Sequence, residues 1–304
     1  MNSRCAHNGG TIRSAALVVL FLCAGATRAD DRAYADALKA AGHSVKLEKD
    51  GTLSAITFAK SEKLTNADFE QLGALKGLTR LTFYGDCKMT DAQAAHVGKL
   101  ATLEELAING TALSDDGFKE FAKLKNLRSL TIWHLGWQNK ALTGKGFSAL
   151  AECPRLERFN FAGSTVGDDG LKALAAVKTL TEVVCYHTRI TDDGLKHLKS
   201  LPRLKAVNVG PQFSMRLGEP GLATLAEIPT LERITYDETV LTRAGSLDRL
   251  KALKNLKELV LNKTEVSAAD LAALKADLPG VAVRHAPPDE KMLDQMRKIL
   301  DKKK

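Results

Sequence analysis

The chain has 304 residues, with 44 basic and 36 acidic residues and a formal net charge of +8 at pH 7. Without residues 1–29, which carry three arginines and no acid, 41 basic and 36 acidic residues remain, a net charge of +5. This modest excess, without rows of Arg and Lys among aromatics, argues against nucleic-acid binding. Of the five cysteines, three lie beyond residue 29, and this odd number without regular spacing is not a disulfide framework.

Residues 1–29 are predicted to be a secretory signal peptide. Arg4 and Arg13 give a positive start, residues 15–26 are apolar, and residues 27–29 form a small-residue cleavage site. An uncleaved membrane anchor is the alternative interpretation. No later segment is apolar enough for a transmembrane helix. We therefore expect an exported protein, periplasmic, in the cell envelope or extracellular, whose mature chain has no transmembrane span.

Residues 30–52 are predicted to form an N-terminal cap. Residues 31–41 have the pattern of a short helix. Val45 and Leu47 then lead through the turn at 49–51 toward the next apolar segment, which suggests a hairpin. Because the first unit of a stacked array exposes its apolar face, such a cover is required.

Residues 53–280 contain an apolar triplet that recurs nine times at steps of 24 to 29 residues. The triplets are Leu53/Ile56/Phe58, Leu78/Leu81/Phe83, Leu103/Leu106/Ile108, Leu127/Leu130/Ile132, Leu156/Phe159/Phe161, Leu180/Val183/Cys185, Leu204/Val207/Val209, Leu231/Ile234/Tyr236 and Leu256/Leu259/Leu261. This period predicts an α/β fold, a right-handed leucine-rich-repeat solenoid of about nine strand–turn–helix units. The strands are expected to form a parallel sheet on the concave face of one elongated domain.

The repeat at residues 180–203 illustrates one unit. Its triplet predicts a short strand, and Leu195, Leu198 and Leu201 predict one inward face of a short helix. The segment Thr191–Gly194 is expected to cap that helix. Paired aspartates recur at this position, at 115–116, 168–169 and 192–193. Calcium could bridge such pairs, whereas helix capping explains them without a metal.

Residues 281–304 are predicted to be a C-terminal cap with a basic tail. Residues 281–283 can add a last strand, and the prolines at 287–288 break the chain. Met292 and Met296, with the apolar pair at 299–300, give one apolar face to a final helix. A helix that binds a partner is the alternative interpretation of this segment.

The repeat resembles the cysteine-containing leucine-rich repeats of F-box proteins and their secreted bacterial relatives. The resemblance is carried by Leu113–Phe118, Val166–Leu171 and Ile190–Leu195, and it covers about residues 53–278. It implies protein–protein recognition on a scaffold without catalysis. No F-box precedes the repeats, which argues against a ubiquitin-ligase adaptor.

The concave surface and two inserted loops are the predicted binding site. Side chains alternate along a strand, so the polar members of each strand face the concave side. The two longest repeats carry extra residues directly after the strand, at 134–141 and 211–216, and such insertions often form the binding face. The predicted ligand-binding residues are Trp133, His134, Trp137, Tyr186, Phe213, Met215, Tyr84 and Arg158. In the alternative interpretation, the loop aromatics seal the edge of the core.

No catalytic constellation is recognised. The histidines form no H-E-x-x-H motif, and neither a nucleophile elbow nor a glycine-rich phosphate loop is found. We therefore expect no enzyme, no cofactor and no metal. The expected function is a monomeric, exported scaffold that binds a protein or peptide. The alternative is a structural or glycan-binding component of the cell envelope.

Overall fold

The computed structural model describes residues 28–134, 139, 141–210 and 217–301. Its strands form a single 11-stranded sheet in which the spatial order follows the chain order. The strands are β1 (Ser44–Leu47), β2 (Leu53–Phe58), β3 (Arg80–Phe83), β4 (Glu105–Asn109), β5 (Ser129–Trp133), β6 (Arg158–Asn160), β7 (Glu182–Val184), β8 (Ala206–Val209), β9 (Arg233–Asp237), β10 (Glu258–Asn262) and β11 (Ala282–Ala286). Each strand from β2 to β10 contains the middle residue of one of the nine predicted triplets.

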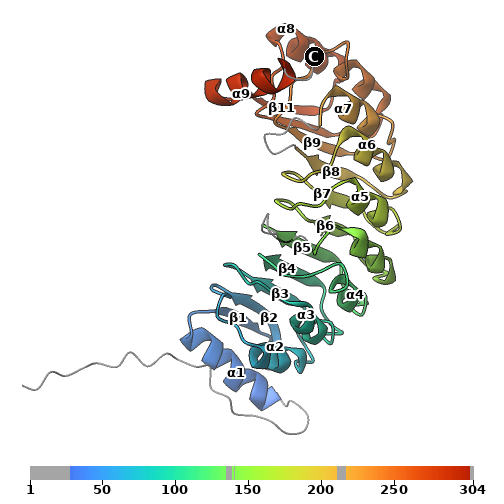
Figure 1. Ribbon diagram of the computed structural model, residues 1–304. Coiled ribbons are helices and arrows are strands. Elements are labelled where there is room, and N and C mark those ends of the chain that lie inside the picture. The colour runs from blue at the N-terminus through green and yellow to red at the C-terminus, as the bar shows by residue number, and fades with distance from the viewer. Residues whose placement is uncertain (1–27, 135–138, 140, 211–216, 302–304) are drawn as a thin grey trace, which may run out of the picture.

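The helical segments of the repeats lie on the other side of the stack, whereas the first and the last helix lie at its two ends (Figure 1). They are α1 (Arg28–Ala40), α2 (Asn66–Gly73), α3 (Asp91–Val97), α4 (Phe118–Phe121), η1 (Lys145–Glu152), α5 (Asp168–Leu174), α6 (Asp192–Leu195), η2 (Lys196–Ser200), α7 (Glu219–Leu225), η3 (Leu247–Ala252), α8 (Ala268–Asp277) and α9 (Glu290–Asp301). In the described part of the chain, no helix has the length and apolar character needed to cross a membrane.

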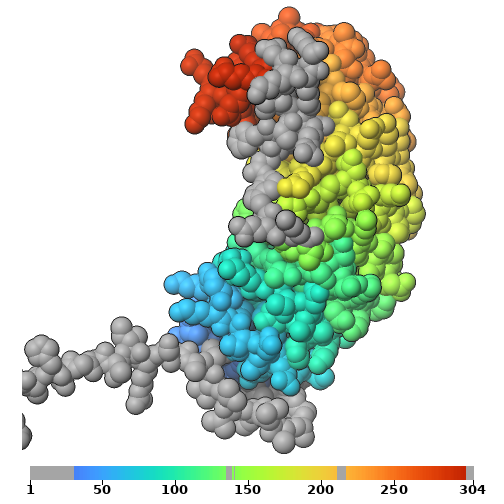
Figure 2. Space-filling view, viewed as in Figure 1, coloured from blue at the N-terminus to red at the C-terminus, as the bar shows by residue number. Residues whose placement is uncertain are grey.

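The predicted solenoid is confirmed. The strands from β2 to β11 pair in parallel, while β1 pairs with β2 antiparallel as an added edge. The strands line the inside of a curved body and the helices its outside (Figure 1), and the surface is hollowed on the strand side (Figure 2). Equivalent triplet residues lie side by side, as Leu81, Leu106 and Leu130 do.

One continuous apolar core runs along the stack. In β4, Leu106 and Ile108 are buried, whereas Glu105, Ala107 and Asn109 face the concave side. The same alternation recurs in successive strands, and the buried residues form one cluster that extends from α1 to the segment after α8. Because each repeat covers the apolar face of the next, burial is shared between neighbours and no unit is independent.

The repeat helices are shorter and tighter than the sequence suggested. Three of them, η1, η2 and η3, are 3₁₀ segments. Thr191 of the predicted capping segment is the N-cap residue of α6, but its side chain makes no capping hydrogen bond to that helix. Instead, Asp168 of the preceding repeat accepts hydrogen bonds from the backbone N–H of Thr191 at 2.8 Å and from its hydroxyl at 2.7 Å.

This link between repeats recurs along the stack and is named here the carboxylate ladder. An acidic side chain at the start of one helix accepts a hydrogen bond from the backbone that enters the next helix. The pairs are Asp91 with Ser114, Asp115 with Thr143, Asp168 with Thr191, Asp192 with Gly218 and Glu219 with Thr242. The recurrent acids therefore tie neighbouring repeats together.

The ladder also explains the glycine that follows the acids in the repeat. A Cβ on Gly194 would lie 2.1 Å from Oδ1 of Asp168, and one on Gly117 would lie 2.2 Å from Oδ1 of Asp91. Neither glycine has a positive φ, so its backbone conformation does not require glycine. Glycine is required here because a Cβ would clash with the neighbouring carboxylate. Each glycine leaves room for the carboxylate of the preceding repeat.

The N-terminal end of the stack is covered by a helix. Helix α1 packs Ala35 and Leu38 into the main core, and Asp31 accepts a hydrogen bond of 3.2 Å from the backbone N–H of Leu53. At the other end, β11 is only partly buried. Met292 and Met296 of α9 pack against Val240, which follows β9, in a second, smaller apolar cluster.

We predict that Asp168→Ala lowers the free energy of unfolding by about 1–3 kcal/mol, because it leaves two partly buried donors of Thr191 without their acceptor. Asp169→Ala is the matched control. It removes an exposed acid that contacts Lys145 at 3.7 Å, and its effect is expected to stay within about 0.5 kcal/mol. Urea unfolding followed by circular dichroism measures both. Equal destabilisation by the two variants would refute the ladder.

Candidate functional site

The parallel register arranges the ends of the strands into two rows on the concave side. The strand-end row consists of Tyr84, Asn109, Trp133, Ala162, Tyr186, Gly210, Asp237 and Asn262, since Asn109 pairs with Trp133 and Asp237 with Asn262. The next residue of seven repeats has a left-handed backbone. This left-handed row consists of Gly85, Gly110, His134, Gly163, His187, Glu238 and Lys263, whose φ angles lie between 49° and 82°.

The first half of these rows holds an aromatic cluster, defined here as Tyr84, Trp133 and His134. Tyr84 and Trp133 meet edge to face with ring centroids 6.3 Å apart, across the intervening strand β4. On that strand, Oδ1 of Asn109 lies 3.0 Å from Nδ1 of His134. Tyr84 is 48% exposed. The cluster thus presents an aromatic surface whose rings are held by neighbouring repeats.

The second half of the concave face is built around the small side chains of β8. On this face β8 and the residue after it carry Ala206, Asn208 and Gly210. Longer side chains from β7 and β9 meet across them. Arg233 donates to Glu182 at 2.9 Å, and His187 Nε2 lies 3.2 Å from Oε1 of Glu238. We name the space between these two bridges the β8 recess.

Two neighbouring acids border this recess. Glu238 is 4% exposed, and its Oε1 also lies 3.5 Å from Nζ of Lys263. Burial raises the pKa of Asp237 to about 6, and the charge of Glu238 adds to this rise. Hydrogen bonds from Asn262 and the proximity of His187 act in the opposite direction on that pKa. Asp237 is therefore mostly ionised at neutral pH, and its ionisation there costs folding free energy relative to the unfolded chain.

The structure brings some predicted site residues together and separates others. Tyr84, Trp133 and His134 form one cluster. Tyr186 is half-buried and meets its neighbour His187 edge to face at 5.0 Å. Arg158 is exposed at the start of β6, so it lies at the opposite end of the strand from the two rows. The remaining predictions, Trp137, Phe213 and Met215, lie outside the described residues.

The sequence reasoning missed Asn208, Asp237 and Glu238. It ranked concave residues by aromatic character and by insertions, and these three residues satisfy neither criterion. The sequence did contain one indication of the third residue. Gly85, Gly110 and Gly163 recur at one position of the repeat, in the left-handed row, where the turn prefers glycine. Glu238 at the equivalent position departs from that preference.

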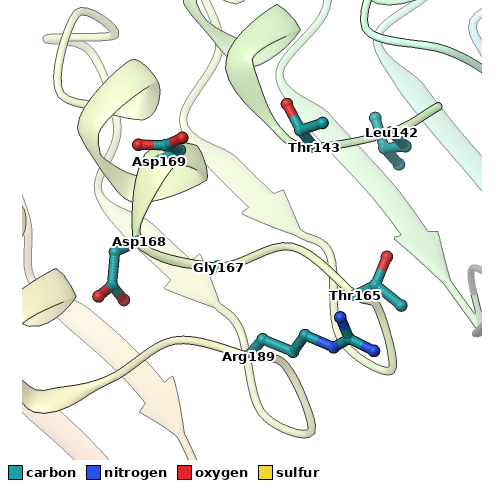
Figure 3. Close-up of a pocket in the computed structure, with 7 residues that line it drawn as sticks. All are labelled: Leu142, Thr143, Thr165, Gly167, Asp168, Asp169 and Arg189. Carbon is teal, nitrogen blue, oxygen red and sulfur yellow. The ribbon is translucent and has the colours of Figure 1, made fainter. Parts of the chain in front are cut away.

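A second hollow lies on the side of the stack where the helices begin. It has a volume of about 460 Å³ and is lined by Leu142, Thr143, Thr165, Gly167, Asp168, Asp169 and Arg189 (Figure 3). It coincides with a gap in the carboxylate ladder, since Gly144 stands where other repeats carry an acid. Asp168 is engaged by Thr191 and Asp169 by Lys145. The acids of this hollow therefore already have partners.

The described residues hold no group of three or more His, Cys, Asp or Glu side chains arranged to bind a metal ion. Cys87, Cys153 and Cys185 are free and buried. Burial raises the pKa of the Cys87 and Cys153 thiols to about 11, so both stay protonated at neutral pH. The chemistry that the concave face offers is thus aromatic contact, hydrogen bonding and charge.

A family model described as "Leucine Rich repeat" matches residues 152–175. The period and the parallel sheet agree with this match and give the chain the fold of a leucine-rich-repeat solenoid, which suggests a scaffold for protein–protein interaction. The narrower resemblance to F-box-type repeats stays a prediction. No curated protein matches the chain.

Two solved structures from Listeria monocytogenes are similar to the chain. The crystal structure of internalin C2 is 20% identical, covers 73% of this chain and 84% of its own, and has a TM-score of 0.42. The crystal structure of an internalin (inlF) is 17% identical, covers 81% of this chain and 85% of its own, and has a TM-score of 0.42.

We predict that Asp237→Asn raises the melting temperature at pH 7.5. Because the folded-state pKa lies above the ordinary value of 3.8, the stability contributed by protonated Asp237 is lost as pH rises through about 6. The variant removes that loss, which is about 3 kcal/mol at most. The gain should shrink toward zero between pH 6 and pH 4. Asp86→Asn, with a mostly exposed side chain, is the control, and a gain independent of pH would contradict the prediction.

Proposed function

We propose that the chain is an exported, monomeric and non-catalytic recognition protein that binds a protein or peptide on its concave face and adjoining loops. The observation that carries the proposal is the aromatic cluster. In the described part of the chain, Tyr84 is the large apolar side chain that is exposed, and it is held against Trp133 on the concave side. Solenoids of this class use that side to bind partners.

A binding surface loses conformational freedom when its side chains become fixed against a partner, and this loss costs free energy. Aromatic side chains have few torsions to fix, and they supply a large contact area with a polar atom at one end. Interface energy is concentrated in such anchors, with Tyr, Trp and Arg prominent among them. The contact between Tyr84 and Trp133 already restricts both rings before a partner arrives. Arg158, exposed at the other end of its strand, would lie at the rim of the same interface.

The sequence supports including the two inserted loops in the binding face. Trp137 follows Trp133 and His134 closely along the chain, and Phe213 and Met215 directly follow the strand that floors the β8 recess. Loops that follow the strands of a solenoid extend the binding face. We include these three residues in the proposed interface, and sealing of the core edge is the competing role for them.

A structural or glycan-binding component of the cell envelope is the second candidate function. The edge-to-face pair of Tyr84 and Trp133 favours it, because aromatic rings also stack on the apolar faces of sugars. A protein partner and a polysaccharide can be separated by offering each to the same variant.

We predict that Tyr84→Ala with Trp133→Ala abolishes capture of the partner from envelope and secreted fractions by the chain without residues 1–29. The exposed helix residue Lys119→Ala is the control on the opposite side of the stack and should capture normally. Circular dichroism verifies that both variants are folded. Capture of the same proteins by the double variant would place the interface elsewhere. If the parent chain binds purified envelope polysaccharide and the double variant does not, the result would instead support the glycan-binding function.

We predict that the exported protein begins at Asp30, because the apolar segment ends shortly before a small-residue cleavage site. Expression in a host with fractionation of cells and medium, followed by intact-mass spectrometry, measures the start of the chain. An intact chain recovered from the membrane fraction would favour the uncleaved anchor.

A further inference from the structure

The positive charge of the protein is concentrated along one edge of the solenoid. Eight segments join a repeat helix to the next strand, at residues 74–79, 98–104, 122–128, 153–157, 175–181, 201–205, 226–232 and 253–257. Because the strands they enter are parallel and follow the chain order, these segments lie side by side at the edge where the strands begin. They contain 11 Lys and Arg and 4 Asp and Glu, a net charge of +7. The remainder of the chain beyond residue 29 has 30 basic and 32 acidic residues, a net charge of −2.

The acids of this edge are neutralised by neighbouring bases. The ion pairs are Glu104 and Glu157 with Arg128, Glu227 with Lys199, and Glu232 with Lys205 and Lys257. Six other bases of the same segments are exposed and have no acidic partner in the described part of the chain. This basic edge row consists of Lys76, Lys99, Arg155, Lys178, Arg203 and Lys254.

Contacts between repeats connect parts of the row. Nζ of Lys178 donates a hydrogen bond of 2.9 Å to the carbonyl of Ser200 in the next repeat, and Arg155 donates at 2.8 Å to Oδ1 of Asn126 in the preceding one. A base near the end of a helix also gains up to about 1 kcal/mol from the helix dipole at an exposed site. The segment 226–232 nevertheless makes the same connection without a basic residue. Folding alone therefore does not require the row.

The composition of the segments restricts the kind of partner. They contain no Phe, Tyr or Trp, so they lack the aromatic platform on which single-stranded nucleic acids stack. Their leucines are buried, so no large apolar side chain is available to enter a lipid surface. The edge instead offers separate cations that recur with the repeat. A polymer that carries anionic groups at regular intervals complements such a row.

We propose that the basic edge row binds a linear polysaccharide that carries sulfate, phosphate or carboxylate groups. Each contact pairs an anionic group with an ammonium or guanidinium group and releases counterions from the polymer. Several weak contacts along the edge then add up without a pocket. The row lies at the opposite end of the strands from Tyr84 and Trp133. The inference therefore goes beyond the proposed function and does not depend on the aromatic cluster.

The test measures binding of dextran sulfate to the exported chain by biolayer interferometry over a series of sodium chloride concentrations. Neutral dextran is the control polymer and should not bind. The triple variant Arg155→Gln, Lys178→Gln and Arg203→Gln removes three cations from neighbouring repeats. We expect it to lower the affinity at least about tenfold and to reduce the slope of log affinity against log salt by about 2 to 3.

A matched variant separates the row from net charge. Lys119→Gln, Lys145→Gln and Lys196→Gln together remove the same number of charges from exposed side chains at the edge where the helices begin. This variant should bind dextran sulfate like the parent chain. Replacing each base of the first triple variant by the other basic residue type, Lys for Arg and Arg for Lys, should restore binding. Circular dichroism verifies that all variants are folded.

Lysine acetylation of the parent chain gives a measurement that needs no variant. Dextran sulfate should protect the lysines of the basic edge row from acetic anhydride and leave Lys119 and Lys196 as reactive as before, measured by mass spectrometry of peptides. Equal protection of both sets, equal loss of affinity in the two triple variants, or equal binding of dextran and dextran sulfate would overturn the inference. Tighter binding of a single-stranded oligonucleotide than of dextran sulfate would also overturn it.

The same assay distinguishes this inference from the proposed function. The variant Tyr84→Ala with Trp133→Ala should retain dextran sulfate binding while losing its captured partner. Loss of dextran sulfate binding in that variant would move the polysaccharide to the aromatic cluster and refute the edge. Partner capture by a chain that does not bind dextran sulfate would uphold the recognition function and refute the edge.

Discussion

The contact on which the rest of the structure depends is the one between a carboxylate of one repeat and the backbone of the next. Asp168 fixes the entry to the following helix through two hydrogen bonds with Thr191, and Gly194 leaves the space that this carboxylate needs. Apolar burial alone would hold two repeats together with some freedom to slide. A directional, charge-assisted bond at the same position in successive repeats fixes their register. Constant register is what converts a series of turns into ordered rows on the concave face.

The ladder is interrupted at one place, and the interruption coincides with other irregularities. Gly144 replaces the acid in the repeat that has the longest step, 29 residues, and Gly167 replaces the hydroxyl residue that would have received it. The hollow of about 460 Å³ is lined by Gly167 and by Thr143, the neighbour of Gly144. The other repeat with extra residues after its strand keeps its bond to the next repeat, between Glu219 and Thr242, so the insertion alone does not remove the bond. Stacking of the repeat that contains Gly144 relies on apolar contacts such as those of Phe147 with Phe159 and Phe161.

The sequence was sufficient to predict the core positions, because they are periodic. It was insufficient to predict the side-chain contacts that join one repeat to another. Leu106 and Ile108 could be assigned to the core because alternation and period determine both face and register. The role of Asp168 could not be assigned, because its partner is 23 residues away and local capping rules describe only its own helix. In the same way, Tyr84 and Trp133 could be placed on one face. The contact of His187 with Glu238 spans 51 residues, so no local rule describes it.

In the left-handed row, the residue that the turn needs for folding can be distinguished from the side chain that the concave surface presents. Gly85, Gly110 and Gly163 show that the turn itself needs only a residue that tolerates positive φ. His134, His187 and Glu238 adopt the same conformation at a cost of about 1 kcal/mol each, and Glu238 is in addition a buried acid with an unpaired oxygen. None of these features improves packing, since a glycine at the same position would remove the strain and the burial together. Proteins retain such costs where a surface is shaped for binding. The strained side chains occur in the aromatic cluster and beside the β8 recess, the two parts of the concave face that argue most strongly for recognition.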